Sequence, residues 1–192
     1  ELSFDGLSEG LRRFLSSKNV DRAFVLRNAG LLCSNASLPG SSLATIPITG
    51  NFMGVIEPMA HSRVFTTINL DFYVDKQYKM LKFMEHWMDY VSNGSENSGV
   101  TKDQDGYYYR MRYPNTYMDP QGMEIIKFER DMENYLTYRF VHNYPLAINS
   151  MPVSYDSSSL LKCTVSMTYI RYYVESLESE ERTTQPKQTK CL

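Results

Sequence analysis

The sequence predicts a protein built mainly of antiparallel β-strands, with one helix packed against them. Apolar and polar residues alternate with a period of two over several segments, which is typical of strands with one buried and one wet face. A single later segment instead places its apolar residues on one stripe at helical spacing. That stripe consists of Met80, Phe83, Met84, Trp87 and Val91.

Length and composition fit one folded domain with short extensions. The chain has 192 residues, and its hydrophobic fraction of 42% is enough for a real core. The formal net charge of −2 argues against a dedicated nucleic-acid-binding protein, because such proteins usually carry a basic patch or stripe. We divide the chain into an arm or short helix (1–22), a β domain (23–175) and a polar C-terminal tail (176–192).

The N-terminal part is expected to begin with a helix and continue into short strands. Apolar spacing favours an amphipathic helix around Leu7–Ser16, or alternatively an arm that becomes ordered only against a neighbour. Ala23–Leu26 and Leu31–Ser34 are predicted as two short strands around a turn at Asn28-Ala29-Gly30.

The segment Leu43–Ser62 is apolar but irregular, since Pro47, Gly50, Gly54 and Pro58 interrupt it. We predict a long exposed loop, and a loop this apolar is unusual in a monomer. Exposed apolar patches commonly mark protein–protein contacts. The candidate contact residues are Phe52, Met53, Val55, Ile56 and Met59.

A clear strand, Val64–Val74, precedes the helix. Asp75 is placed to cap a helix over Lys76–Ser92, and Asn93-Gly94 is a common helix ending. The Met and aromatic stripe of this helix indicates core packing and not a cofactor site.

The second half of the chain is predicted to be mostly strands. These cover Gly106–Tyr113, Met123–Arg130 and Asn134–Asn143, with a loop over Tyr144–Tyr155. A long strand then runs from Leu160 to Val174, and at about 3.3 Å per residue it would reach roughly 40–50 Å. Its apolar parity switches near Tyr169-Ile170, which indicates a bulge or a strand buried on both faces.

Nothing in the sequence points to catalysis, a cofactor or a metal. The histidines show no metal spacing, and neither a nucleophile motif nor a phosphate-binding loop is present. Cys33, Cys163 and Cys191 lie far apart, and Cys163 falls in an apolar register, so reduced thiols in a reducing compartment are expected. A membrane span and a signal peptide are not expected either.

Several blocks together resemble the tail tube proteins of contractile-tailed bacteriophages, over Ala23 to Glu175. Each block alone is weakly specific, whereas their order and spacing are fairly specific. They are Cys33-Ser34-Asn35-Ala36-Ser37-Leu38-Pro39-Gly40, Ile46-Pro47-Ile48, Gly50-Asn51-Phe52-Met53, Arg63-Val64-Phe65, the strand Thr66–Val74, the helix with Phe83 and Trp87, Tyr144-Pro145, Tyr155-Asp156 and Tyr172-Tyr173-Val174-Glu175.

The resemblance implies two packed antiparallel sheets with a flanking helix, related to type VI secretion tube proteins. It also implies hexameric rings that stack into a hollow conduit, whose inner wall is a β-barrel closed across subunits. Lys162 runs against a neutral or acidic wall and fits the ring edge instead. Candidate residues facing the lumen are Thr67, Asn69, Asp71, Thr164, Ser166 and Thr168.

The same resemblance implies the partners: other copies of the chain, a sheath protein, a tape measure protein and a baseplate. DNA would pass through the lumen transiently and without sequence preference, and no membrane is involved. The expected location is the virion tail, assembled in the cytoplasm of the bacterial host. Alternatives are a baseplate or tail-completion ring, a tube of a contractile injection or secretion system, and a β-sandwich enzyme or ligand-binding module.

Overall fold

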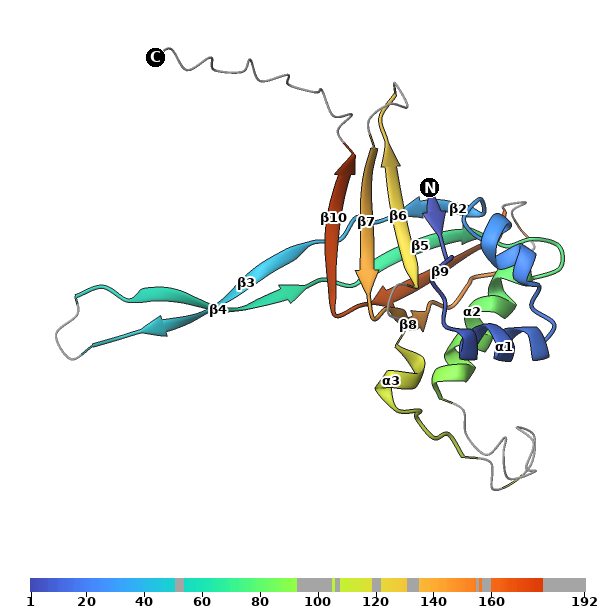
Figure 1. Cartoon of the computed structure of the whole chain (residues 1–192), viewed down its shortest axis with the longest axis horizontal. Helices are drawn as coiled ribbons and strands as arrows, with labels where there is room; N and C mark the ends of the chain where they lie inside the picture. The colour runs from blue at the N-terminus through green and yellow to red at the C-terminus, as the bar shows by residue number, and fades with distance from the viewer. Residues whose placement is uncertain are drawn as a thin grey trace, which may run out of the picture.

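Two four-stranded antiparallel sheets and a helical layer share one hydrophobic core (Figure 1). The structure is a computed structural model, and it describes residues 1–50, 54–92, 105, 108–118, 122–130, 135–154, 156 and 160–177. The sequence-based prediction of a mainly β protein with packed antiparallel sheets and a helix is confirmed. Further short helical segments accompany this helix, and one of them matches the helix predicted around Leu7–Ser16.

The first sheet, called here the polar-faced sheet, has the strand order β2-β5-β9-β8. One face enters the core, because Ile68, Leu70 and Phe72 alternate along β5 with polar residues and are fully buried. The opposite face carries the polar residues of the same alternation. Its strands are β2 (Cys33–Ala36), β5 (Ile68–Tyr73), β8 (Tyr144–Ile148) and β9 (Lys162–Thr168).

The second sheet has the order β1-β6-β7-β10, and its strands cross those of the first sheet steeply in Figure 1. Met123 and Phe140 are buried from this sheet in the shared core. Ion pairs join its outer face, where Arg139 Nε lies 3.3 Å from Glu124 and 3.4 Å from Glu175. Its strands are β1 (Leu2–Ser3), β6 (Met123–Phe128), β7 (Tyr135–Val141) and β10 (Arg171–Leu177).

The predicted long strand from Leu160 to Val174 is wrong as a single element, because β9 and β10 belong to different sheets. The parity switch predicted near Tyr169-Ile170 is real, and it marks the corner where the chain leaves one sheet for the other. Ile170 N donates to Val141 O at 3.1 Å there. The buried ring of Tyr169 packs on Phe140 with centroids 4.9 Å apart.

The helical layer covers the apolar face of the polar-faced sheet. Helix α2 (Lys79–Val91) buries Trp87, whose ring lies 6.2 Å from that of Phe4. Asp75 Oδ1 accepts from Lys79 N at 2.7 Å, so the predicted cap is present, but the helix begins at Lys79 and not at Lys76. The helix cannot begin before Lys79 because Tyr78 has a φ of 56°, which is left-handed and not helical.

A helix near the N-terminus, α1 (Glu9–Ser17), packs against α2 as part of the same core. Ser8 caps it by accepting from Leu11 N at 3.4 Å, and Leu11 and Leu15 are buried. A π-helical turn, η1 (Phe24–Asn28), replaces the strand predicted over Ala23–Leu26. The second predicted strand lies two residues further on, as β2.

The predicted loop over Leu43–Ser62 is wrong, because the segment forms a two-stranded hairpin that projects from the body (Figure 1). From here on, "the arm" means this hairpin and not the N-terminal segment 1–22. It consists of β3 (Ser41–Ile48) and β4 (Glu57–Phe65). Pro47 and Pro58 face each other across it. Proline is tolerated at an edge position whose N–H would point away from the partner strand, and both strands of this ribbon are edges.

Two smaller expectations are wrong, and a third cannot be compared with the described residues. Tyr144 to Ile148 forms strand β8 where a loop was predicted, and the described residues 108–113 of the predicted strand Gly106–Tyr113 have no strand structure. A short helix, α3 (Pro114–Tyr117), follows them. The predicted helix ending at Asn93-Gly94 lies outside the described residues, and α2 is last seen closing with Ser92 N donating to Met88 O.

Candidate assembly surfaces

A single carboxylate connects three strands on the exposed side of the polar-faced sheet. Asp71 on β5 accepts through Oδ1 from the Thr164 hydroxyl on β9 at 2.5 Å. Its Oδ2 accepts from the Asn35 amide on β2 at 3.1 Å. These two hydrogen bonds, the Thr164 one first, lower the pKa of Asp71. The carboxylate is therefore ionised at neutral pH.

A second polar rung lies beside the first. Asn69 Oδ1 accepts from the Ser166 hydroxyl at 2.8 Å, between residues directly paired across β5 and β9. The Ser37 hydroxyl both accepts from Asn69 N at 2.7 Å and donates to Asn69 O at 3.1 Å. These side chains are thus paired with one another within the sheet, so this face is polar but leaves fewer groups free to bind a ligand.

The structure brings four of the six predicted lumen residues together in these rungs: Asn69, Asp71, Thr164 and Ser166. Thr168 lies at the end of β9, paired with Tyr144. Thr67 is exposed in the link between β4 and β5, beyond the regular part of the sheet.

Asn35 and Ser37 complete the rungs but were missed as site residues by the sequence analysis. They lie beside β5 in the structure, although they precede their partners on β5 by more than 30 positions in the chain. The only available signal was the polar run around them, which also fits an ordinary loop.

The arm carries an exposed apolar stripe. Ile46 pairs with Met59, and the two side chains are 52% and 51% exposed. Directly opposed residues of an antiparallel pair share one face, so Ile48, paired with Glu57, continues the stripe toward the tip. An isolated hairpin with exposed apolar groups is marginally stable alone, which indicates that a partner covers it.

The predicted contact residues are located on this arm as far as the structure describes them. Met59 lies in β4, and Val55 and Ile56 lie just before it with 75% and 60% of their side chains exposed. Phe52 and Met53 lie outside the described residues.

Among the described residues, both sheets end in strands without a second neighbour: β2 and β8 in one, β1 and β10 in the other. Such edges present backbone donors and acceptors that invite pairing with another chain. Pro145 and a register shift interrupt β8, and a second register shift interrupts β2. The edges are therefore short and shaped, as expected for selective pairing.

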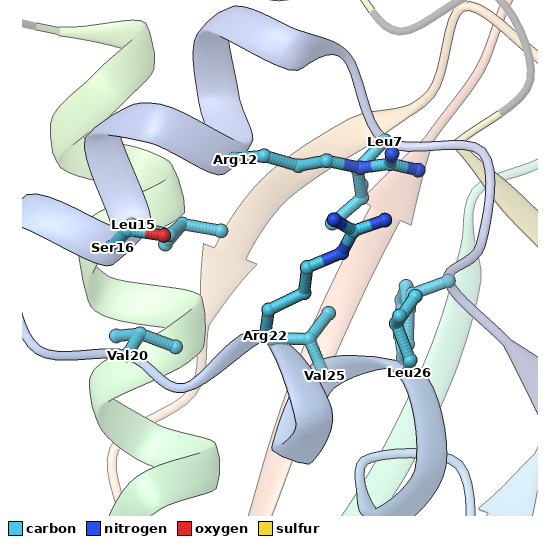
Figure 2. Close-up of a pocket in the computed structure, with 9 residues that line it drawn as sticks. Leu7, Arg12, Leu15, Ser16, Val20, Arg22, Val25 and Leu26 are labelled. Atoms are coloured by element: carbon cyan, nitrogen blue, oxygen red, sulfur yellow. The ribbon is translucent and has the colours of Figure 1, made fainter.

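A surface hollow of about 310 Å³ beside the start of α2 is lined by Asp21, Phe24, Lys79 and Lys82 among others, and one of about 160 Å³ lies beside β2. A small apolar cavity of about 20 Å³ lies between α1 and η1, lined by Leu7, Leu15 and Val25 (Figure 2). Arg12 and Arg22 reach across it in Figure 2, and the Arg12 guanidinium donates to the Asp5 carbonyl. A cavity of this size holds about one water molecule.

Metal and thiol chemistry find no support in the same part of the chain. No group of three or more His, Cys, Asp or Glu side chains that could hold a metal ion occurs among the described residues. Burial raises the pKa of both Cys33 and Cys163, which favours the protonated form of these thiols. Within the described ranges, helices long and apolar enough to cross a membrane are absent.

Comparison with known proteins finds structures of similar fold. The tube-terminating cap of the anti-feeding prophage is similar in structure, with a TM-score of 0.51, 12% identity, and coverage of 75% of this chain and 80% of that chain. At this identity the likeness supports the fold alone. No curated protein sequence matches the chain.

Two further structures are similar at lower scores. The sheath–tube complex of an extracellular contractile injection system (PVC) in its extended state has a TM-score of 0.49 and 13% identity, covering 76% of this chain and 81% of that chain. The sheath/tube terminator of the same system has a TM-score of 0.49 and 13% identity, with coverage of 74% and 84%.

A family model described as phage tail tube protein matches residues 1–175. The match includes the arm, helix α1 and nearly all of both sheets. Of these, α1 lies outside the range Ala23 to Glu175 over which the sequence resembled the family. With a match over nearly the whole length, the chain belongs to the phage tail tube protein family.

Proposed function

We propose that this structural tail tube subunit stacks as hexameric rings into the hollow conduit of a contractile tail, and that the polar-faced sheet lines the channel. The observation that carries the proposal is the polar network on a sheet whose two central strands, β5 and β9, bury their apolar side chains completely on the other face. A free monomer has no need for a sheet face whose polar side chains bond to one another. A channel wall does, because it must be polar without binding the molecule that passes.

The chemistry of the wall suits passage of a polyanion. Asp71 stays ionised and accepts from the Thr164 hydroxyl, and Asn69 accepts from the Ser166 hydroxyl. Phosphates are repelled by the carboxylate and find few donors, so DNA would not adhere through the salt-dependent contacts that Lys and Arg provide. Thr67 and Thr168 extend the same wall toward the end at which the arm leaves.

Ring closure would use the free edges of the polar-faced sheet. β2 of one copy pairs with β8 of the next, so that successive sheets join into one barrel and lose their edges. The conduit is passive in this proposal, without catalysis, metal or cofactor. Its cargo is transient, non-specifically held DNA.

The arm holds neighbouring copies together. Ile46, Met59, Val55 and Ile56 are the described anchors, and Phe52 with Met53 remain predicted anchors at its tip. Burying such side chains at a contact is what makes a few residues dominate an interface.

Other tail proteins complete the proposal. Similar structures come from a sheath–tube complex, a tube-terminating cap and a baseplate, which supports contacts with a sheath and a baseplate. A tape measure protein inside the lumen and assembly in the host cytoplasm follow from the same role. The protein is then a component of the virion tail.

Negative-stain electron microscopy of the purified protein tests the assembly directly. The unaltered chain should give hollow tubes or stacked rings, whereas Ile46→Asp with Met59→Asp should give unassembled subunits. Lys82→Asp, on the exposed side of α2, is the control and should assemble normally. If the arm variant still forms tubes, the arm is not part of the contact between copies. If the unaltered chain forms no rings, the proposed tube assembly is wrong.

A channel variant tests the wall separately. Asn69→Lys adds a cation to the proposed lumen and should slow genome delivery while leaving tubes intact, and Asn69→Gln is its matched control. The measurement is the rate of DNA release from phage carrying each variant. Equal rates would place Asn69 outside the lumen.

A baseplate ring and an injection-system tube are distinguished by abundance and cargo. A tube subunit is among the most numerous proteins of the particle, and a baseplate ring is not. Quantitative gel analysis of purified particles therefore decides between a tube and a baseplate ring, and the presence of DNA or of a protein effector in the particle separates a phage tube from an injection-system tube.

A further inference from the structure

The end of the polar-faced sheet opposite the arm carries a second exposed apolar surface. Three strand ends meet there: Tyr73 N donates to Leu32 O at 2.9 Å, and Val74 N donates to Leu161 O at 3.0 Å. Four apolar or aromatic side chains project from these ends and from the turn after β5. We call the following residues the end patch: Leu31, Tyr73, Tyr78, Leu160 and Lys162.

The end patch is apolar with a cation at its margin. Leu31 and Leu160 are 79% and 77% exposed, more than almost all other large apolar side chains of the described chain. Lys162 Nζ lies 5.1 Å from the centre of the Tyr73 ring, which holds the ammonium group beside the patch.

The arm and the end patch lie at opposite ends of the same strand. β5 begins at Ile68, three residues after the arm ends at Phe65, and it finishes at Tyr73 within the patch. In Figure 1 the arm leaves on one side, and the turn between β5 and α2 lies on the other. Shifting one copy along this direction therefore brings its arm toward the end patch of the next copy.

The two surfaces also match in chemistry. Each has exposed aliphatic groups, and the arm bears the exposed carboxylate of Glu57 where the patch bears the exposed ammonium of Lys162. A polymer of one chain has to carry both halves of every contact, and unlike halves at opposite ends give a head-to-tail, open-ended assembly.

We propose that the end patch is the docking surface for the arm of a second copy in the adjacent ring, with Glu57 facing Lys162. This inference rests on the proposed role of the arm and names its acceptor. Arms then point toward one end of the tube and end patches toward the other.

Disulfide cross-linking of assembled tubes tests the contact. Val55→Cys with Leu160→Cys, in a Cys33→Ser, Cys191→Ser background, is oxidised after assembly and run on a non-reducing gel. The gel should show cross-linked products of more than six subunits. Each copy contributes one arm and one end patch across a ring boundary, so the cross-links continue from ring to ring. A ladder that stops at one ring overturns the proposal, since the contact would then lie within a ring.

A matched pair examines the rival acceptor, the exposed strip at 108–113. Tyr113 is 75% exposed and lies away from the sheet end, so Val55→Cys with Tyr113→Cys should give no ladder. Cross-linking there, or intact tubes with no Val55–Leu160 product, overturns the proposal while leaving the tube function in place. If the unaltered protein forms no tubes at all, the proposed function fails, and this inference with it.

Charge reversal supplies an independent measurement. Glu57→Lys or Lys162→Glu alone should raise the protein concentration needed for assembly about fivefold, and the two together should restore it. Glu85→Lys on the exposed side of α2 is the control and should change nothing. Failure of the double variant to recover would show that the two groups do not face each other.

Discussion

Replacing Asp71 by Asn tests whether the carboxylate that spans β2, β5 and β9 stabilises the fold. The substitution keeps size and shape but removes the charge. An Asn amide still offers one oxygen to Thr164, whereas its NH₂ would meet the donor of Asn35. One charge-assisted hydrogen bond is lost and one is weakened.

The magnitude follows from those two contacts, at 2.5 Å and 3.1 Å. Hydrogen bonds to charged groups contribute about 1.5–3 kcal/mol each when buried. This face is only partly buried, so solvent screening reduces the combined loss to about 1 kcal/mol. For a chain of this size, that corresponds to about 2–4 °C in Tm.

The loss should depend on pH in a defined direction. The folded-state pKa of Asp71 is lowered, so its contribution is present above the ordinary pKa of an aspartic acid, about 3.9. It disappears as the pH falls through the lower folded-state value, where both proteins carry a neutral side chain. The difference between wild type and Asp71→Asn should therefore be full at pH 7 and shrink in acid.

Urea unfolding at pH 7 and at acidic pH measures this difference. The single tryptophan, Trp87, is fully buried and reports unfolding by fluorescence. Both proteins should carry Ile46→Asp with Met59→Asp to remain unassembled, and Asp21→Asn is an exposed control. An equal loss at both pH values, or none at pH 7, would refute the account of Asp71 as a charged link between strands.

Two further substitutions and one labelling experiment test the core and a buried thiol. Trp87→Ala should lower the free energy of unfolding by about 3–5 kcal/mol, and an unchanged Tm would contradict the shared core. Gly30→Ala should destabilise the fold, because its Cβ would lie 1.9 Å from the Leu2 carbonyl oxygen; a wild-type melting curve would show that β1 does not pack there. Cys163 should react with a thiol reagent only after denaturant is added, since it is fully buried, and rapid labelling of the native protein would oppose this placement.

Local pattern predicted the parts of the fold in which one element packs on one face. β5 alternates strictly, and α2 places its large side chains on one stripe, so each could be assigned without knowing its neighbours. The break at Tyr169-Ile170 was visible as a parity change. Its meaning, a move from one sheet to another, depends on strand pairing that no local pattern contains.

The arm shows why the rest was not predictable. Pro47 and Pro58 interrupt a strand pattern in sequence, yet they are harmless where they face each other in a two-stranded ribbon. The site divides in the same way. Thr164 and Asp71 were found through their alternation, whereas Asn35 joins them only after folding brings β2 beside β5.

The proline pair of the arm has a consequence for how free subunits behave before assembly. Because Pro47 and Pro58 oppose each other, both outer margins of the ribbon lack a backbone donor at the same level. An extended segment of another chain cannot zip along either margin past that point, which hinders fibril growth. At high concentration, subunits therefore aggregate less readily through backbone pairing. Recognition between copies then depends on complementary side chains.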